Sequence, residues 1–103
     1  MLNYIIKFLP KNINVLKVPH HGAIGGLDNN LIQHLNPDYS IISVGENKFG
    51  HPSIYTLKLL NKSEILRTDV DNAILLKYSK NSLKIYTYAI NKRKFIKKHQ
   101  TCF

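Results

Sequence analysis

The chain has 103 residues, of which 44% are apolar, ten are aromatic and one is a cysteine. This length accommodates one small domain, and the apolar content is typical of a folded α/β or α+β domain rather than a disordered segment. A single cysteine excludes a disulfide framework within the chain and favours a reducing compartment. No run approaches the ~18 consecutive apolar residues that a membrane span needs, and we expect no signal peptide because the first residues lack a small-residue cleavage site.

The formal net charge of +9 is concentrated in the last third of the sequence. Seven basic and six acidic side chains occur up to Asp71, whereas the remaining residues carry eight basic side chains and no acidic one. The basic region 77–98 therefore predicts attraction to nucleic acid, with an affinity that falls steeply as salt rises. A second interpretation stays open, in which residues 91–103 are a solvated, lysine-rich tail encoded by an AT-rich genome.

The first half of the sequence predicts a strand followed by a helix. Residues 2–8 are apolar and fit either a helix or a strand; we favour a helix. Residues 14–18 are rich in β-branched side chains and stop at Pro19, a pattern that predicts a strand. Apolar residues then recur at helical spacing over 27–35, and this helix is expected to end before Pro37.

The second half predicts further alternation and then a hairpin. Residues 39–44 read as a strand, and Ser53 is a plausible N-cap for a helix with one apolar face. Residues 64–67 give a brief third strand. Two apolar segments, 73–78 and 83–88, flank a polar turn and predict a β-hairpin.

Strands that are joined through helices are normally parallel neighbours with right-handed crossovers. Their carboxyl ends then meet at one edge of the sheet, where α/β folds bind their ligands. The sequence thus predicts an α/β fold of β-α-β-α-β order with a C-terminal β-hairpin, and it directs attention to the three loops at that edge.

The three loops carry four side chains that could act together. His20 and His21 follow the first predicted strand, His51 follows the second, and Asp69 follows the third. Because neighbouring strands are ~4.8 Å apart, these groups could reach a shared ion. Neutral imidazole and carboxylate are ligands that divalent Zn or Mn accepts.

Each of these residues also has a simpler interpretation. Adjacent histidines in a loop are often surface residues, and an aspartate after a strand is commonly a cap or an Asx-turn residue. The six tyrosines are interpreted as core or sheet-surface aromatics rather than as base-stacking platforms. Composition and spacing therefore leave both a metal site and an ordinary polar surface open.

A series of ordered motifs carries a resemblance to a known family. The segments are Val15–Gly22 (VLKVPHHG), Pro37–Gly45 (PDYSIISVG), Asn47 with Gly50–Pro52 (GHP), and Arg67–Asp69 (RTD). Together they resemble the ComEC-type branch (DNA internalisation competence proteins) of the metallo-β-lactamase superfamily. The likeness runs from about Asn14 to Tyr88. It implies that residues 1–90 are the C-terminal half of an αββα sandwich, followed by a basic tail at 91–103.

The resemblance also implies a chemistry, which is metal-dependent hydrolysis of phosphodiesters during DNA uptake at a centre of two divalent metals, Zn or Mn. On this basis His20 is the expected metal ligand. His21 is expected beside it, facing either the ligand shell or the substrate. His51 is expected to steady the scissile phosphate or the leaving oxygen.

Three further residues receive roles from the same resemblance. Asp69 is expected to belong to the catalytic group and to orient one of the histidines, because a metal-binding imidazole usually needs a hydrogen-bond partner for its other ring nitrogen. Asn47 and Lys48 are expected to contact the substrate phosphate. Ala23 stands where the family often has serine, and Asn72 where it commonly has glycine.

Two family motifs are absent from the sequence. The HxHxDH motif and the Gly-Asp motif supply most metal ligands in this superfamily, and neither occurs here. We therefore expect the chain alone to be inactive, and to need an N-terminal half of the same fold as partner or to form a homo-oligomer. The parent family is membrane-anchored, which leaves the location of this chain open. A non-catalytic, basic nucleic-acid-binding module and a gene remnant that keeps half the fold are the alternatives.

Overall fold

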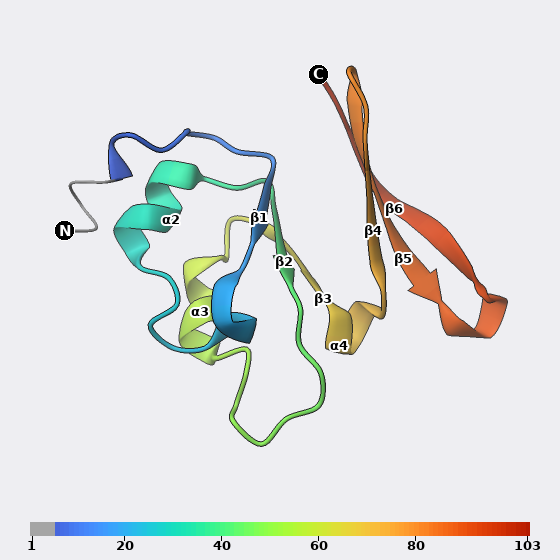
Figure 1. Ribbon diagram of the computed structural model, residues 1–103, viewed down its shortest axis with the longest axis horizontal. Helices are drawn as coiled ribbons and strands as arrows, with labels where there is room; N and C mark the ends of the chain where they lie inside the picture. Colours follow the sequence, from blue (N-terminus) through green and yellow to red (C-terminus); the bar gives the residue numbers. More distant parts are fainter. Residues whose placement is uncertain (1–5) are drawn as a thin grey trace. The chain divides into compact units, whose positions relative to one another are not determined.

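The computed structural model describes residues 6–103, which divide into two compact units (Figure 1). The first unit is Met1–Arg67 and the second is Thr68–Phe103. Each unit contains one small three-stranded sheet, and helices are few and short. The predicted α/β class is therefore confirmed.

The first unit is built on a parallel sheet. Strands β1 (Val15–Lys17), β2 (Tyr39–Ile42) and β3 (Glu64–Arg67) pair in the order β1-β2-β3. Both pairings are parallel, as the alternation of strands and helices predicted. The carboxyl ends of all three strands consequently lie along one edge of this sheet.

Two helices connect these strands, and each begins at a polar cap. Helix α2 (Asn29–Leu35) starts after Asp28, whose side chain accepts a hydrogen bond of 2.8 Å from the Leu31 N–H. Helix α3 (Ile54–Leu59) starts after Ser53, whose Oγ accepts a bond of 3.1 Å from the Thr56 N–H. The cap predicted at Ser53 is confirmed, and both caps satisfy backbone donors that have no partner within the helix.

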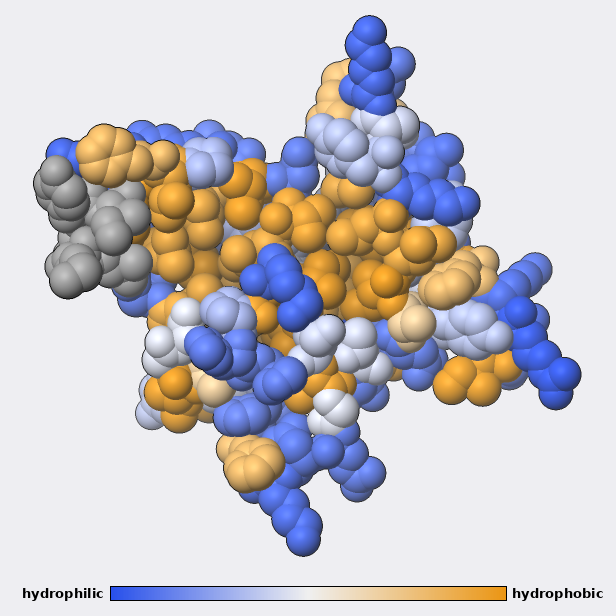
Figure 2. Space-filling model, viewed as in Figure 1, coloured by the Kyte–Doolittle hydropathy of each residue, from blue (hydrophilic) through white to orange (hydrophobic). Residues whose placement is uncertain are grey.

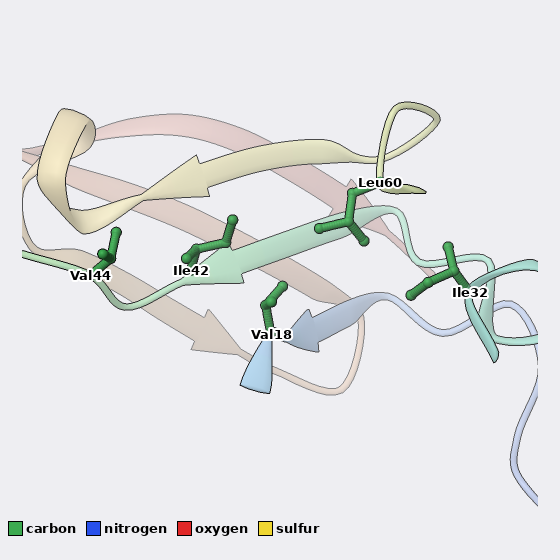
Figure 3. Packing of buried hydrophobic residues seen from close by; sticks show 5 residues of the cluster. All are labelled: Val18, Ile32, Ile42, Val44 and Leu60. Carbon is green, nitrogen blue, oxygen red and sulfur yellow. The ribbon is translucent and has the colours of Figure 1, made fainter. Parts of the chain in front are cut away.

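An apolar cluster packs the helices onto the sheet (Figure 3). It comprises Val18, Ile32, Ile42, Val44 and Leu60. Ile42 is fully buried, and Val18 and Leu60 are 1% exposed. Burying a side chain of this size stabilises a fold by roughly 1.5–3 kcal/mol. The cluster therefore fixes the strand ends from which the loops at the sheet edge emerge.

The second unit is an antiparallel meander. After the single-turn helix α4 (Thr68–Asp71), β4 (Ile74–Tyr78) pairs with β5 (Ser82–Ala89), as the hairpin prediction required. The Ser79 N–H donates to the Ser82 carbonyl at 2.8 Å and closes the turn between them. The short 3-10 helix η2 (Ile90–Lys92) leads into β6 (Lys94–Cys102), which pairs antiparallel with β5.

Two elements differ from the sequence-based expectation. Most of the segment 91–103, expected as a basic tail, is strand β6, which pairs with β5 from end to end. Lysine and histidine side chains in β6 hide the alternation that marks a strand. Thr68 and Asp69, expected in a loop, lie in α4. The helix expected over residues 2–8 falls mostly on residues 1–5, outside the described part, and the proposed division at residue 90 stays a prediction.

No helix within residues 6–103 has the length and apolar character needed to cross a membrane.

A candidate histidine site at the edge of the parallel sheet

The loop after β1 is a tight turn with an uncommon backbone. The 3-10 segment η1 (Pro19–Gly22) holds His20 at φ 53° and His21 at φ 56°, both in the left-handed region, and Gly22 follows at φ 80°. Left-handed conformation costs an ordinary residue about 1–2 kcal/mol. Two consecutive histidines in this region therefore store strain that the surrounding structure has to offset.

Gly22 explains how this turn is held in place. It is buried, and a Cβ at this position would lie 2.6 Å from the Cβ of Pro52. The Gly22 carbonyl accepts a 2.9 Å hydrogen bond from the N–H of Ser53, the cap of α3. The absence of a side chain thus lets the loop after β1 lie directly against the end of the loop after β2.

Asn47 organises the loop after β2. Its Oδ1 accepts hydrogen bonds from the N–H groups of Phe49 (3.0 Å) and His51 (3.1 Å). Its Nδ2 donates to the carbonyls of Gly45 and His51, both at 3.0 Å. Both amide hydrogens are therefore used inside the loop, and Asn47 positions His51. The contact with phosphate expected for Asn47 stays a prediction.

The two loops share one open cavity of about 480 Å³. It is lined by His20, His21, Ala23, Ile24, Gly25, Gly26 and His51. His20 and His21 are exposed and His51 is half-buried, so the imidazoles are accessible to solvent. Figure 2 shows mainly hydrophilic surface over the loop between β2 and α3, at the bottom of the view. His20, His21 and His51, up to 31 positions apart in the sequence, thus line one cavity from two loops.

His21 has a defined orientation within the site. Its Nδ1 lies 2.7 Å from the carbonyl oxygen of Ser43, which follows β2. A carbonyl only accepts, so Nδ1 carries the proton and the neutral ring keeps a lone pair on Nε2. In a histidine that binds a metal through one ring nitrogen, the other ring nitrogen usually donates its hydrogen to a carbonyl, a carboxylate or water. Sequence reasoning missed the Ser43 carbonyl, because a main-chain acceptor leaves no signal in the sequence.

The ring of His51 is accompanied by an exposed aromatic. The Phe49 and His51 ring centroids are 5.8 Å apart with an interplanar angle of 22°, and the Phe49 side chain is 81% exposed. Lys48 is exposed on the same loop. The loop after β2 thus presents an imidazole, an ammonium group and an aromatic ring together.

Asp69 and the three histidines belong to different units of the chain. Asp69 is exposed in α4, at the start of the second unit, whereas the residues that line the cavity all belong to the first unit. Its expected role in orienting a histidine stays a prediction.

The donor side chains of the described residues decide whether the chain alone could bind a metal ion. Among residues 6–103, no three His, Cys, Asp or Glu side chains come together in a group that could hold a metal ion. Within that part of the chain, the three imidazoles of the cavity do not form a site for Zn or Mn by themselves. A larger cavity of about 680 Å³ lies along α2 and α3, but no histidine or carboxylate lines it.

The fold and loops define a small α/β chain with a cluster of histidines at the edge of a parallel sheet. The chain is similar to ComE operon protein 3 of Bacillus subtilis (strain 168), with 43% identity over 68 residues. The match covers 63% of this chain and 9% of that protein, so the chain spans a small part of the relative's length. No family model matches the chain, and no solved structure matches it. The similarity agrees with the competence-protein side of the resemblance, while the metallo-β-lactamase sandwich stays a prediction.

Proposed function

We propose that this chain belongs to a DNA-uptake protein related to ComE operon protein 3, in which it supplies one wall of a metal-dependent phosphodiesterase site. The observation that carries the proposal is the shared cavity that His20, His21 and His51 line from two loops. The similarity to ComE operon protein 3 supports the DNA-uptake context. The hydrolytic chemistry rests on the family resemblance and on the residues of the cavity.

The backbone of η1 gives the proposal physical support. The two left-handed histidines cost the fold about 2–4 kcal/mol in total, and burial of their side chains does not offset this cost, because both are exposed. Strained residues of this kind cluster at functional sites. A surface turn without a function would adopt the same path at lower cost with glycine or asparagine.

The chain's own residues would share three tasks at such a site. His21 would present Nε2 in a direction fixed by the Ser43 carbonyl, and His20 would lie beside it. His51, held by Asn47, would donate a hydrogen bond to a non-bridging phosphate oxygen. Bound divalent metals would supply an acidic water as nucleophile, but these residues do not complete a metal site, so we assign no step to this chain through a metal.

The missing ligands would come from a second segment that carries the HxHxDH and Gly-Asp motifs. We propose that this segment is an N-terminal half of the same αββα sandwich. The test is to mix the purified chain with such a segment, taken from ComE operon protein 3, and to follow hydrolysis of bis(p-nitrophenyl) phosphate with Mn²⁺ or Zn²⁺. We expect no activity from either part alone and activity from the mixture.

Histidine variants make this test specific. In the active mixture, His20→Ala and His51→Ala should each lower the rate at least about a hundredfold, the usual loss for a group that stabilises transition-state charge. His99→Asn is the matched control, because it removes a histidine from β6 in the second unit. An inactive mixture, or equal rates for all three variants, would contradict the proposal.

A second candidate function is a non-catalytic nucleic-acid-binding module. The observation that favours it is the charge of residues 72–103, with eight basic side chains and no acidic one. Salt-dependent DNA binding should survive His20→Ala and His51→Ala. It should be lost when the basic residues of segment 92–98 are neutralised, namely Lys92, Arg93, Lys94, Lys97 and Lys98.

A further inference from the structure

The antiparallel sheet of the second unit has two unlike faces. Leu83, Ile85 and Thr87 of β5 are buried, at 2%, 0% and 6% exposure. Successive side chains of a strand point to opposite faces, so Lys84, Tyr86 and Tyr88 lie on the other face, where they are half-buried. The second face therefore carries lysine and tyrosine where the first carries the apolar residues.

The strand register extends this second face onto both neighbouring strands. Residues directly opposite each other in an antiparallel pair share a face. The residues paired with Lys84, Tyr86 and Tyr88 are Lys77 and Leu75 on β4, and Gln100, Lys97 and Phe95 on β6. Leu75 is the one aliphatic residue among them, and we call the remaining set of Lys77, Lys84, Lys97, Gln100, Tyr86, Tyr88 and Phe95 the lysine–aromatic face.

Contacts within this face hold its cations close to its rings. The Lys77 Nζ lies 5.1 Å from the centroid of the Tyr86 ring, within cation–π distance. The Tyr88 and Phe95 rings meet edge to face, with centroids 5.2 Å apart. The Lys97 Nζ donates to the Gln100 Oε1 at 2.9 Å. Phe95 is 41% exposed, so an aromatic surface is open to a ligand.

The positive charges of the lysines on this face favour binding of an anionic partner. Lys77 and Lys84 are directly opposite each other, and like charges in this position are destabilising. No acidic residue occurs after Asp71, so β4, β5 and β6 supply no acidic side chain to neutralise them. Figure 2 shows further hydrophilic side chains projecting at both ends of this sheet, at the β4–β5 turn and at the β5–β6 connection.

We propose that the lysine–aromatic face binds single-stranded nucleic acid. Proteins bind single strands by combining cations that follow the phosphates with aromatic rings on which successive bases stack. Here Lys77, Lys84 and Lys97 serve the phosphates, and Tyr86, Tyr88 and Phe95 offer the rings. In a duplex the bases are already stacked on each other, so the rings select the single strand. The inference deepens the second candidate function and is independent of the histidine site.

The experiment measures fluorescence anisotropy of a fluorescein-labelled oligo(dT) of about 20 nucleotides, enough to span a typical single-strand site, titrated with the full chain at several salt concentrations. Replacing both tyrosines in Tyr86→Leu/Tyr88→Leu should weaken binding at least about tenfold, because both rings lose their stacking with a base. The Tyr86→Phe/Tyr88→Phe variant keeps the rings and should bind as the unsubstituted chain does. It separates loss of stacking from loss of structure.

The lysines are tested through the salt dependence. Lys77→Gln/Lys84→Gln/Lys97→Gln should reduce the slope of log affinity against log salt by about 2, because each phosphate that a lysine neutralises on a single strand adds about 0.7 to that slope. Lys11→Gln/Lys58→Gln/Lys62→Gln changes the net charge equally within the first unit and should leave most of the slope.

Three outcomes would overturn the inference. The first is equal weakening by the leucine and phenylalanine variants, and the second is an equal reduction of the slope in the two lysine variants. The third is a duplex of the same length, or vesicles rich in phosphatidylglycerol, displacing the oligonucleotide as well as unlabelled oligo(dT) does.

Discussion

The two sheets of this chain differ in where they can present polar side chains to a ligand. In β2 of the parallel sheet, the three consecutive residues Ser40, Ile41 and Ile42 are all buried. In β5 of the antiparallel sheet, buried and half-buried residues alternate from Leu83 to Tyr88. A parallel strand covered on both faces can present polar groups only beyond its ends, whereas an antiparallel strand can present them along one face. The histidine site and the lysine–aromatic face follow this difference.

The largest expected effects come from the centres of the two sheets. Ile42 and Ile85 are both fully buried, so Ile42→Ala and Ile85→Ala should each lower the free energy of unfolding by about 4 kcal/mol. Urea denaturation followed by circular dichroism measures this loss. A much smaller loss for Ile85→Ala would show that the antiparallel sheet packs its buried face less firmly.

The next effect tests how tightly the parallel sheet controls its loops. Gly22→Ala should cost about 3 kcal/mol, because it combines the strain of a positive φ with a contact of 2.6 Å to Pro52. Gly25→Ala is the matched control. Its φ is +87°, but nothing lies within 4 Å of the added Cβ, so it should cost about 1–2 kcal/mol. Equal losses of unfolding free energy would refute the close packing of the two histidine loops.

A smaller effect concerns the helix that begins at the edge of the histidine site. Ser53→Ala removes the cap of α3 and should lower the free energy of unfolding by about 1 kcal/mol. Asp28→Ala, which removes the cap of α2, should cost a similar amount while leaving the site unchanged. The Ser53 Oγ also lies 2.9 Å from the Thr56 Oγ1, which donates to the Ala23 carbonyl at the histidine cavity at 3.3 Å. Only Ser53→Ala breaks this link, so only Ser53→Ala should broaden the NMR signals of His20 and His51.

The smallest expected effect is a proton position. The hydrogen bond from His21 to the Ser43 carbonyl requires the Nδ1–H tautomer of the neutral ring. Long-range ¹H–¹⁵N NMR spectra recorded at alkaline pH, where imidazole rings are neutral, should show this tautomer for His21. A neutral His21 with its proton on Nε2 would contradict the orientation that we assign to the ring.

Local sequence signals predict the elements well wherever they are uninterrupted. The strand predicted at residues 64–67 is β3 with the same bounds, because its neighbours break the pattern clearly on both sides. Strand β6 escapes prediction because lysines occupy positions on both of its faces. A bulge near Ile85 and Tyr86 also shifts its register by one residue, which removes the period of two on which strand prediction depends.

The sequence by itself determined the alternation of strands and helices, the hairpin, and the glycine and proline residues around the histidines, because these depend on neighbours a few positions away. It also indicated that the loops after β1 and β2 would share an edge, since parallel order follows from the crossovers. Only the tertiary structure decided that Ser43 orients His21 and that Asn47 is used within its own loop. It alone assembled Lys77, Tyr86 and Lys97 into one face, because strand register is set by packing across the sheet and not by the order of residues along the chain.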